Sequence, residues 1–191
     1  MQRKTAAELN GELSALRDFF AYNTFVRRRY LAMITGLPEK VRTKDRGASY
    51  PTLVDIMAHV LDAYDCWLHV CQTGELCDTW KHTDETGEDD LLDRKGLSVE
   101  GLTLLEDEVE GRMDDFMRKL QPEDLNGEFH YTLGSGEKRE VRTRKVGDML
   151  WHLVEEELQH RGELNALLWQ DDIEPPVTGW FAWKKSLQAR A

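Results

Sequence analysis

The sequence predicts an all-α fold, a four-helix bundle with a short β-hairpin before its last helix. Four long segments carry apolar residues at helical spacing, and glycine or proline breakers separate them. One short stretch of alternating residues surrounds a glycine-rich turn. We expect a single domain over residues 1–191, with the bundle at about 6–172 and a C-terminal helix at about 178–190.

The first two helices have clear boundaries. The first is expected from about Ala6 to Thr35, because the Gly36-Leu37-Pro38 sequence ends it. The second begins after Thr52, a plausible N-cap, and continues to Gly74. Its apolar positions recur with helical period: Leu53, Met57, Val60, Tyr64, Trp67 and Cys71.

The third and fourth helices flank the predicted hairpin. The third starts at Ser98, which supplies a cap but no full capping box because Gly101 occupies the third following position. It closes before Pro122, and the fourth helix covers about 146–170. Between them, alternating residues flank Gly134-Ser135-Gly136, a pattern typical of a β-hairpin that lies against the helices.

Two segments lie outside the bundle pattern. The acidic connection from Thr73 to Leu97 is longer than the usual loop between helices, and we interpret it as a lid or a mobile insertion. The tail is expected to form a short helix with Trp180, Trp183 and Leu187 on one face. That face would dock on the bundle or on a partner subunit.

Composition excludes several classes of function. A formal net charge of −11 argues against nucleic-acid binding. The basic runs Arg27-Arg28-Arg29 and Arg142-Thr143-Arg144-Lys145 are short, and we interpret them as solvated faces or internal ion pairs. No apolar run of about 18 residues or signal sequence occurs, so we expect a cytoplasmic protein without a membrane span. Because Cys66, Cys71 and Cys77 form no C-x-x-C pair, we expect reduced thiols.

Ionisable residues interrupt the apolar face of the fourth helix. At 100° per residue, His160 lies near the centre of that face, and Glu156 lies one turn earlier, about 40° away. Residues four apart can converge on one atom, so these two form a potential chelating pair. From the helix alone, a hydrogen-bonded core histidine or an internal carboxylate–imidazolium pair is the simpler explanation. Glu157 is an alternative inward carboxylate, and His152 lies at the boundary of the face.

The second helix supplies a candidate third ligand. His59 lies at the edge of its broad apolar arc, beside Ile56, Ala63 and Val70. Asp55, one turn earlier, is placed to accept the second imidazole N–H, as carboxylates commonly do for metal-bound histidines. The alternative is a boundary histidine that simply pairs with Asp55.

These residues belong to stretches that resemble the DinB/YfiT-like superfamily of bacterial four-helix bundles. The stretches are FFAYNTFVRRRYLAMITGLPEKV, TLVDIMAHVLDAYDCWLH and VGDMLWHLVEEELQHRGELNALL. The similarity extends to about Asp172, and its most specific element is His160-Arg161-Gly162 combined with a histidine in the middle of the second helix. The resemblance implies a divalent metal held by His59, Glu156 and His160. Many members have histidine where this chain has Glu156, whereas the related mycothiol-dependent maleylpyruvate isomerases have glutamate there.

The resemblance also implies a chemistry. Two imidazoles and one carboxylate suit zinc, nickel, iron or manganese and leave a coordination position open. Relatives include bacillithiol transferases, so we expect a small-thiol S-transferase in which the metal presents a thiolate, with a small-molecule substrate and a homodimeric assembly. No catalytic residue is identified, and residues expected around the ligands are Asp55, His152, Glu157 and Arg161. The alternatives are a non-catalytic metal-binding bundle expressed under stress and a metal-dependent hydrolase.

Overall fold

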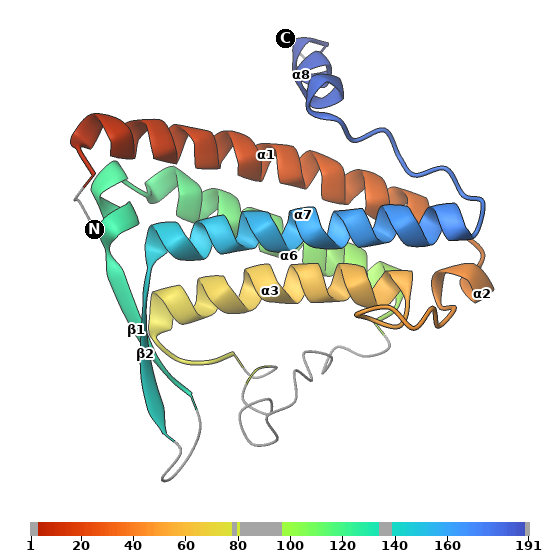
Figure 1. Ribbon diagram of the computed structural model, residues 1–191, viewed down its shortest axis with the longest axis horizontal. Helices are drawn as coiled ribbons and strands as arrows, with labels where there is room; N and C mark the ends of the chain where they lie inside the picture. The colour runs from red at the N-terminus through yellow and green to blue at the C-terminus, as the bar shows by residue number, and fades with distance from the viewer. Residues whose placement is uncertain (1–3, 78–79, 81–96, 134–138, 190–191) are drawn as a thin grey trace.

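A computed structural model describes residues 4–77, 80, 97–133 and 139–189, and these are mostly helical, as predicted (Figure 1). The four long helices are α1 (Ala6–Gly36), α3 (Leu53–Thr73), α6 (Val99–Lys119) and α7 (Val146–Gln170). Strands β1 (Glu128–Leu133) and β2 (Glu140–Lys145) form an antiparallel hairpin between α6 and α7. The short elements are α2 (Glu39–Arg42), the 3-10 helix η1 (Pro122–Asn126) and α8 (Trp180–Gln188).

Local sequence signals account for the helix boundaries. Thr52 and Ser98 cap α3 and α6, because each hydroxyl accepts a hydrogen bond from the backbone N–H three residues later. Gly74 ends α3 in the left-handed conformation, at φ 75°, which favours glycine. Thr5 and Glu8 form a capping box at the start of α1. The predicted boundaries of all four long helices are confirmed to within a few residues.

The helices enclose one apolar core. Helix α3 packs against both α6 and α7, and α1 packs against the same two helices. In Figure 1, α7 lies between α1 and α3, with α6 behind them. Fully buried leucine and isoleucine side chains come from all four long helices: Leu16, Ile34, Leu53, Leu61, Leu102, Leu150 and Leu153. This arrangement places the middle of α3 beside the middle of α7.

The hairpin lies against one end of the bundle. In its register Tyr131 faces Arg142 and Phe129 faces Arg144. Both aromatic rings are buried, so this side of the ribbon packs on α3 and α7. The predicted turn at Gly134–Gly136 and most of the acidic connection lie outside the described residues. The interpretation of that connection as a lid stays a prediction.

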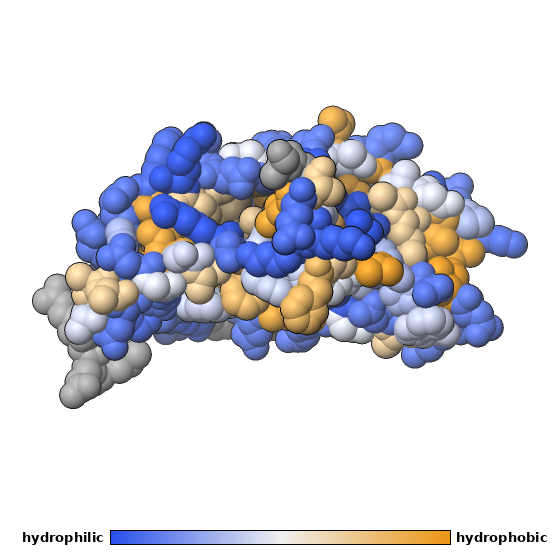
Figure 2. Space-filling model, turned by 90° about the horizontal axis from the view of Figure 1, so that it is seen from above, coloured by the Kyte–Doolittle hydropathy of each residue, from blue (hydrophilic) through white to orange (hydrophobic). Residues whose placement is uncertain are grey.

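The C-terminal helix docks on α1 as predicted, although it is shorter than the expected range of 178–190. Trp183 is buried against Tyr22, and Trp180 packs against Tyr22 and Phe19. Leu187 is exposed, whereas Lys184 pairs with Asp18 of α1 at 3.1 Å, so the two tryptophans and this ion pair anchor the helix. The surface seen from this side is mainly hydrophilic, with scattered hydrophobic patches (Figure 2). Within the described ranges, no helix combines the length and apolarity that a membrane span requires.

The prediction that all three cysteines are reduced is wrong for two of them. Cys66 and Cys77 form a disulfide, with their Cα atoms 5.4 Å apart. The chain reverses at Gly74, which brings the segment after α3 back along the inner face that carries Cys66. A spacing of eleven residues across a helix end has no simple sequence signature. Cys71 remains a free thiol.

Candidate metal centre

Side chains from α3 and α7 converge in the middle of the bundle. His59, Glu156 and His160 each offer a ligand atom, and these atoms lie within 4.8 Å of one another. The Nε2 atoms of His59 and His160 lie 3.4 and 3.5 Å from the same carboxylate oxygen, Oε2 of Glu156. The structure therefore brings together the three residues that the sequence analysis selected as ligands.

The spacing of these atoms fits a divalent ion. A tetrahedral ion with ligand bonds of about 2.1 Å separates its ligands by about 3.4 Å. A direct charge-assisted hydrogen bond between an imidazole and a carboxylate is shorter, about 2.7–2.9 Å. The observed separations match the first geometry better. Both histidines are buried, whereas Glu156 is partly exposed and leaves one side of the cluster accessible.

Glu163 holds His160 in place. Its Oε2 atom lies 3.0 Å from Nδ1 of His160, which directs Nε2 towards Glu156. The Ser49 backbone N–H and hydroxyl both donate to Glu163, at 2.9 and 2.6 Å. Burial lowers the pKa of His160, but the hydrogen bonds to Glu156 and Glu163 outweigh it, and the pKa lies above its usual value.

Tyr50 packs on both histidines. Its ring stacks on His59 at a centroid distance of 4.1 Å and meets His160 edge to face. The predicted role of Asp55 is wrong, because its carboxylate accepts the Thr52 hydroxyl at the start of α3. Among the described residues, Nδ1 of His59 has no hydrogen-bond partner. The stacked tyrosine, rather than a carboxylate, fixes this imidazole.

His152 borders the accessible side of the cluster. Its Nε2 atom lies 3.8 Å from Oε1 of Glu156, the oxygen that does not face the other histidines. The polar contacts with His160 and then with His59 lower the pKa of Glu156 well below its usual value, although burial opposes them. His152 also lies 3.9 Å from Glu155, and its side chain is much more exposed than those of His59 and His160.

Glu157 faces a different part of the core from Glu156. It accepts hydrogen bonds from Arg27 at 2.6 Å and from the Tyr64 hydroxyl at 2.7 Å. Arg27 also binds Glu106 at 3.0 Å, and all three charged side chains are buried. The expectation that Glu157 surrounds the metal ligands is corrected, and the alternative of an internal ion pair for Arg27 is confirmed. Both glutamates point inward, which a single helical stripe could not predict.

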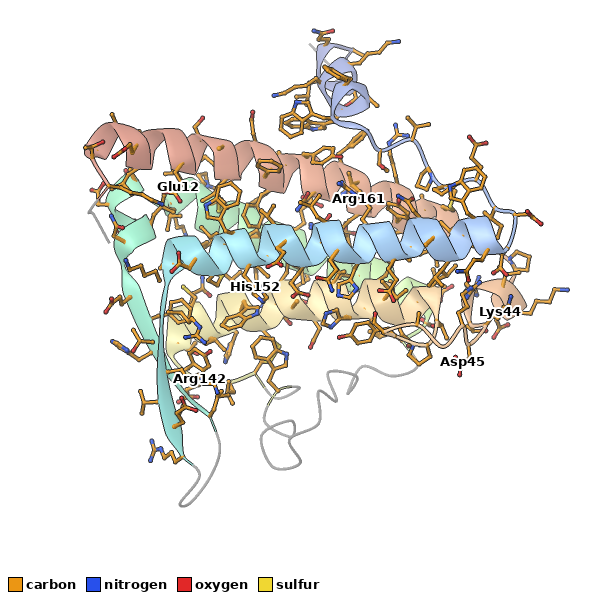
Figure 3. The ribbon with its side chains drawn as sticks, viewed as in Figure 1. Glu12, Lys44, Asp45, Arg142, His152 and Arg161 are labelled. Carbon is orange, nitrogen blue, oxygen red and sulfur yellow. A yellow bond between two sulfur atoms is a disulfide. The ribbon has the colours of Figure 1, made fainter. Side chains whose placement is uncertain are left out.

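Arg161 also lies away from the cluster. Its guanidinium donates to the Tyr22 hydroxyl at 2.9 Å, and that hydroxyl donates to the carbonyl of Thr178. Figure 3 shows Arg161 on the side of α7 that faces α1, whereas His152 lies on the side that faces α3. Arg161 therefore anchors the C-terminal segment, and its predicted place near the metal is wrong.

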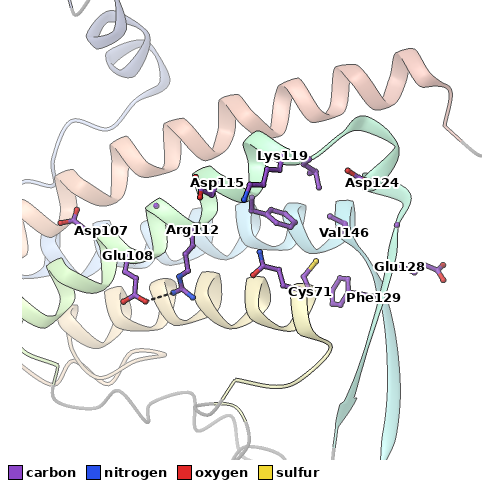
Figure 4. A pocket seen from close by; sticks show the side chains of 15 residues that line it. Cys71, Asp107, Glu108, Arg112, Asp115, Lys119, Asp124, Glu128, Phe129 and Val146 are labelled. Atoms are coloured by element: carbon purple, nitrogen blue, oxygen red, sulfur yellow. Dashed lines mark ion pairs between the residues drawn. The ribbon is translucent and has the colours of Figure 1, made fainter.

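A separate cavity of about 940 Å³ lies between α3, α6 and the base of the hairpin (Figure 4). Cys71, Phe116 and Phe129 line it, and charged residues including Arg112 and Lys119 surround it. Burial raises the pKa of the Cys71 thiol to about 11. This thiol is not a nucleophile at neutral pH.

Comparison with models of known protein families identifies a family for this chain. The model of the DinB family matches residues 1–186. The chain belongs to the DinB family. A search of curated proteins finds no match. As a DinB protein, the chain carries its candidate metal cluster between the second and fourth long helices, where the resemblance placed it.

Two parts of the DinB site escaped the sequence analysis. Glu163 lies three residues after His160, and residues three apart on a helix are neighbours, so its contact was predictable. Tyr50 and Ser49 precede α3 in an irregular segment with no periodic pattern. Their contacts depend on how that segment folds over the helices.

Proposed function

We propose that this DinB protein is a divalent-metal-dependent S-transferase that joins a small thiol to an electrophile. The observation that carries the proposal is the convergence of two buried imidazoles and one partly exposed carboxylate. Three protein ligands leave a coordination position for a further molecule, which is characteristic of catalytic rather than structural sites. Nε2 of His59, Oε2 of Glu156 and Nε2 of His160 would hold the ion.

The ion, when bound, would lower the pKa of a coordinated thiol towards neutrality. The protein residues then have separable tasks. Glu163 and Ser49 keep His160 in the tautomer whose Nε2 lone pair is free. Tyr50 covers His59 and excludes water from that side. His152, beside Glu156, accepts the thiol proton.

In this reaction the sulfur forms a bond to the electrophilic carbon of the second substrate. The S–H bond breaks, its proton passes to Nε2 of His152, and any leaving group departs with its bonding electrons. No redox partner is needed. None of the three cysteines serves as the nucleophile, because two form the disulfide and the pKa of the third is raised.

Metal content is the first measurement. Protein purified without an affinity tag should contain about one divalent ion per chain, and His160→Gln should contain far less. The control is His130→Gln, because His130 is exposed on the hairpin. If the wild type contains no stoichiometric metal and His160→Gln folds equally well, every metal-dependent function is refuted.

Turnover then separates the alternatives. The metal-loaded protein should couple small thiols to monochlorobimane, and His152→Gln should reduce the rate at least about 100-fold. Hydrolysis without added thiol would favour a metal-dependent hydrolase. Stoichiometric metal without turnover of any thiol would favour a non-catalytic metal-binding bundle. The homodimer and the cytoplasmic location stay predictions.

A further inference from the structure

A cleft of about 390 Å³ lies next to the metal cluster, between the hairpin and helices α3 and α7. His152 forms one wall, and the same residue lies 3.8 Å from Glu156. Trp67 forms another wall and meets His152 edge to face at 5.5 Å. His152 therefore lies between the cleft and the cluster, with one side in the cleft wall and the other next to Glu156.

Two arginines line the cleft from the hairpin. Arg142 and Arg144 lie two residues apart on β2, so their side chains emerge on the same face of the ribbon. This face also carries Tyr131, which is buried and lines the cleft. Figure 3 shows Arg142 on the hairpin beside the end of α3, near His152. The arginines thus face the bundle.

The arginines are available to a ligand. In the part of the chain that the structure describes, no carboxylate forms an ion pair with Arg144. Arg142 pairs with Glu140 at 3.1 Å, but both side chains are exposed and such pairs are weak. Asp148 is the acidic residue among those that line the cleft. Two positive charges and one negative charge leave a formal charge of +1, which matches one carboxylate.

We propose that this cleft binds a carboxylate of the thiol substrate through Arg142 and Arg144, while the sulfur reaches the metal cluster. Guanidinium groups bind carboxylates through paired hydrogen bonds. The aromatic walls Trp67 and Tyr131 contact the apolar part of the substrate and exclude water, which strengthens the charged contacts. The proposal rests on the function proposed above, because it names the substrate class of the same site.

The geometry also sets the length of the substrate. His152 and Asp148 precede Glu156 by four and eight residues, which is about 6 and 12 Å along α7. A thiol with its carboxylate roughly 10 Å from its sulfur matches this span. Molecules of tripeptide size meet this requirement, and glutathione is a convenient probe because it carries carboxylates at both ends.

Binding of S-methylglutathione to the metal-loaded protein tests the cleft without chemistry, because the blocked sulfur cannot form a thiolate. Titration calorimetry should give a dissociation constant about tenfold higher for Arg142→Gln/Arg144→Gln than for the wild type. Arg139→Gln is the matched control, because Arg139 is exposed just before β2 and does not line the cleft. It should bind like the wild type. The diethyl ester of the probe should bind weakly to all three proteins.

Three outcomes overturn the inference: absence of binding to the wild type, equal binding by the wild type and the double variant, or equal binding of acid and ester. Failure of the proposed function looks different. If the double variant loses binding but no preparation transfers a thiol, the carboxylate site stands and the transferase does not. If transfer occurs with the same KM for acid and ester thiols, the transferase stands and the carboxylate site does not.

Discussion

Replacement of Arg27 by methionine tests whether this buried guanidinium stabilises the fold by neutralising Glu106 and Glu157. The guanidinium lies between Glu106 and Glu157, with contacts of 3.0 and 2.6 Å, and the three residues are 1 to 3% exposed. Methionine keeps most of the apolar volume but leaves two buried carboxylates without their cation. Removing one member of a buried ion pair usually costs about 3–5 kcal/mol. We expect a loss of this size in the free energy of unfolding.

The loss should depend on pH. Burial raises the pKa of Glu106 although Arg27 opposes the shift, so without Arg27 the pKa rises further. A carboxyl group whose folded pKa is raised binds more protons in the folded state, and stability then falls as pH rises from its unfolded pKa to its folded pKa. Arg27→Met should therefore lose more stability at pH 8 than at pH 5.

Urea unfolding followed by circular dichroism at pH 5, 7 and 8 measures both effects. Arg28→Met is the control. Arg28 lies next to Arg27 on α1 but on its exposed side, where it pairs with Asp107 and Glu110 of α6. It should change the unfolding free energy by less than about 1 kcal/mol. A change below about 1 kcal/mol for Arg27→Met at pH 8, or a loss independent of pH, would refute the reasoning.

Three further predictions concern the metal cluster and the disulfide. Glu163→Gln should weaken zinc binding about 10–100-fold in a chelator-competition assay, because it loosens His160; unchanged affinity would contradict this role. In wild type the affinity should fall as pH drops through the raised pKa of His160, since protons compete for Nε2, while Glu156 stays ionised. A pH-independent affinity between pH 6 and 8 would exclude His160 as a ligand. Reduction of the Cys66–Cys77 disulfide should lower the unfolding free energy of the wild type by about 2–3 kcal/mol, because the bond closes a loop of eleven residues. The same reductant should leave the unfolding free energy of Cys77→Ser unchanged.

The sequence was sufficient to predict the helices and much of the site. Thr52, Ser98 and Gly74 are local signals, and each marks the boundary that it predicts. Helical spacing places Glu156 and His160 on one face but leaves Glu157 as an alternative, and the family resemblance decided between them. The helical pattern made His59 a candidate partner, and the family resemblance selected it, since no local rule links two helices.

The errors have a common physical cause. Asp55, Glu157 and Arg161 were placed by their distance along a helix from a ligand, but each binds an element that spacing does not reveal. A charged residue near an apolar stripe can turn either way around it. Its direction depends on the partner that the neighbouring helix offers, which is a property of the tertiary fold. The disulfide escaped prediction for the same reason.

The positions of His59 and Glu156 have a consequence for how the chain unfolds. They lie 97 residues apart, so an ion bound to both closes a loop that contains α6 and the hairpin. In the chain-entropy description, closing a loop of about 100 residues costs a partly unfolded chain up to about 4.7 kcal/mol of conformational freedom, for as long as the ion stays bound. Helices α1 and α8 lie outside the loop and can separate without releasing the ion. Arg27, which joins α1 to both α6 and α7, is then the buried ionic link that holds the N-terminal helix to the closed part of the chain.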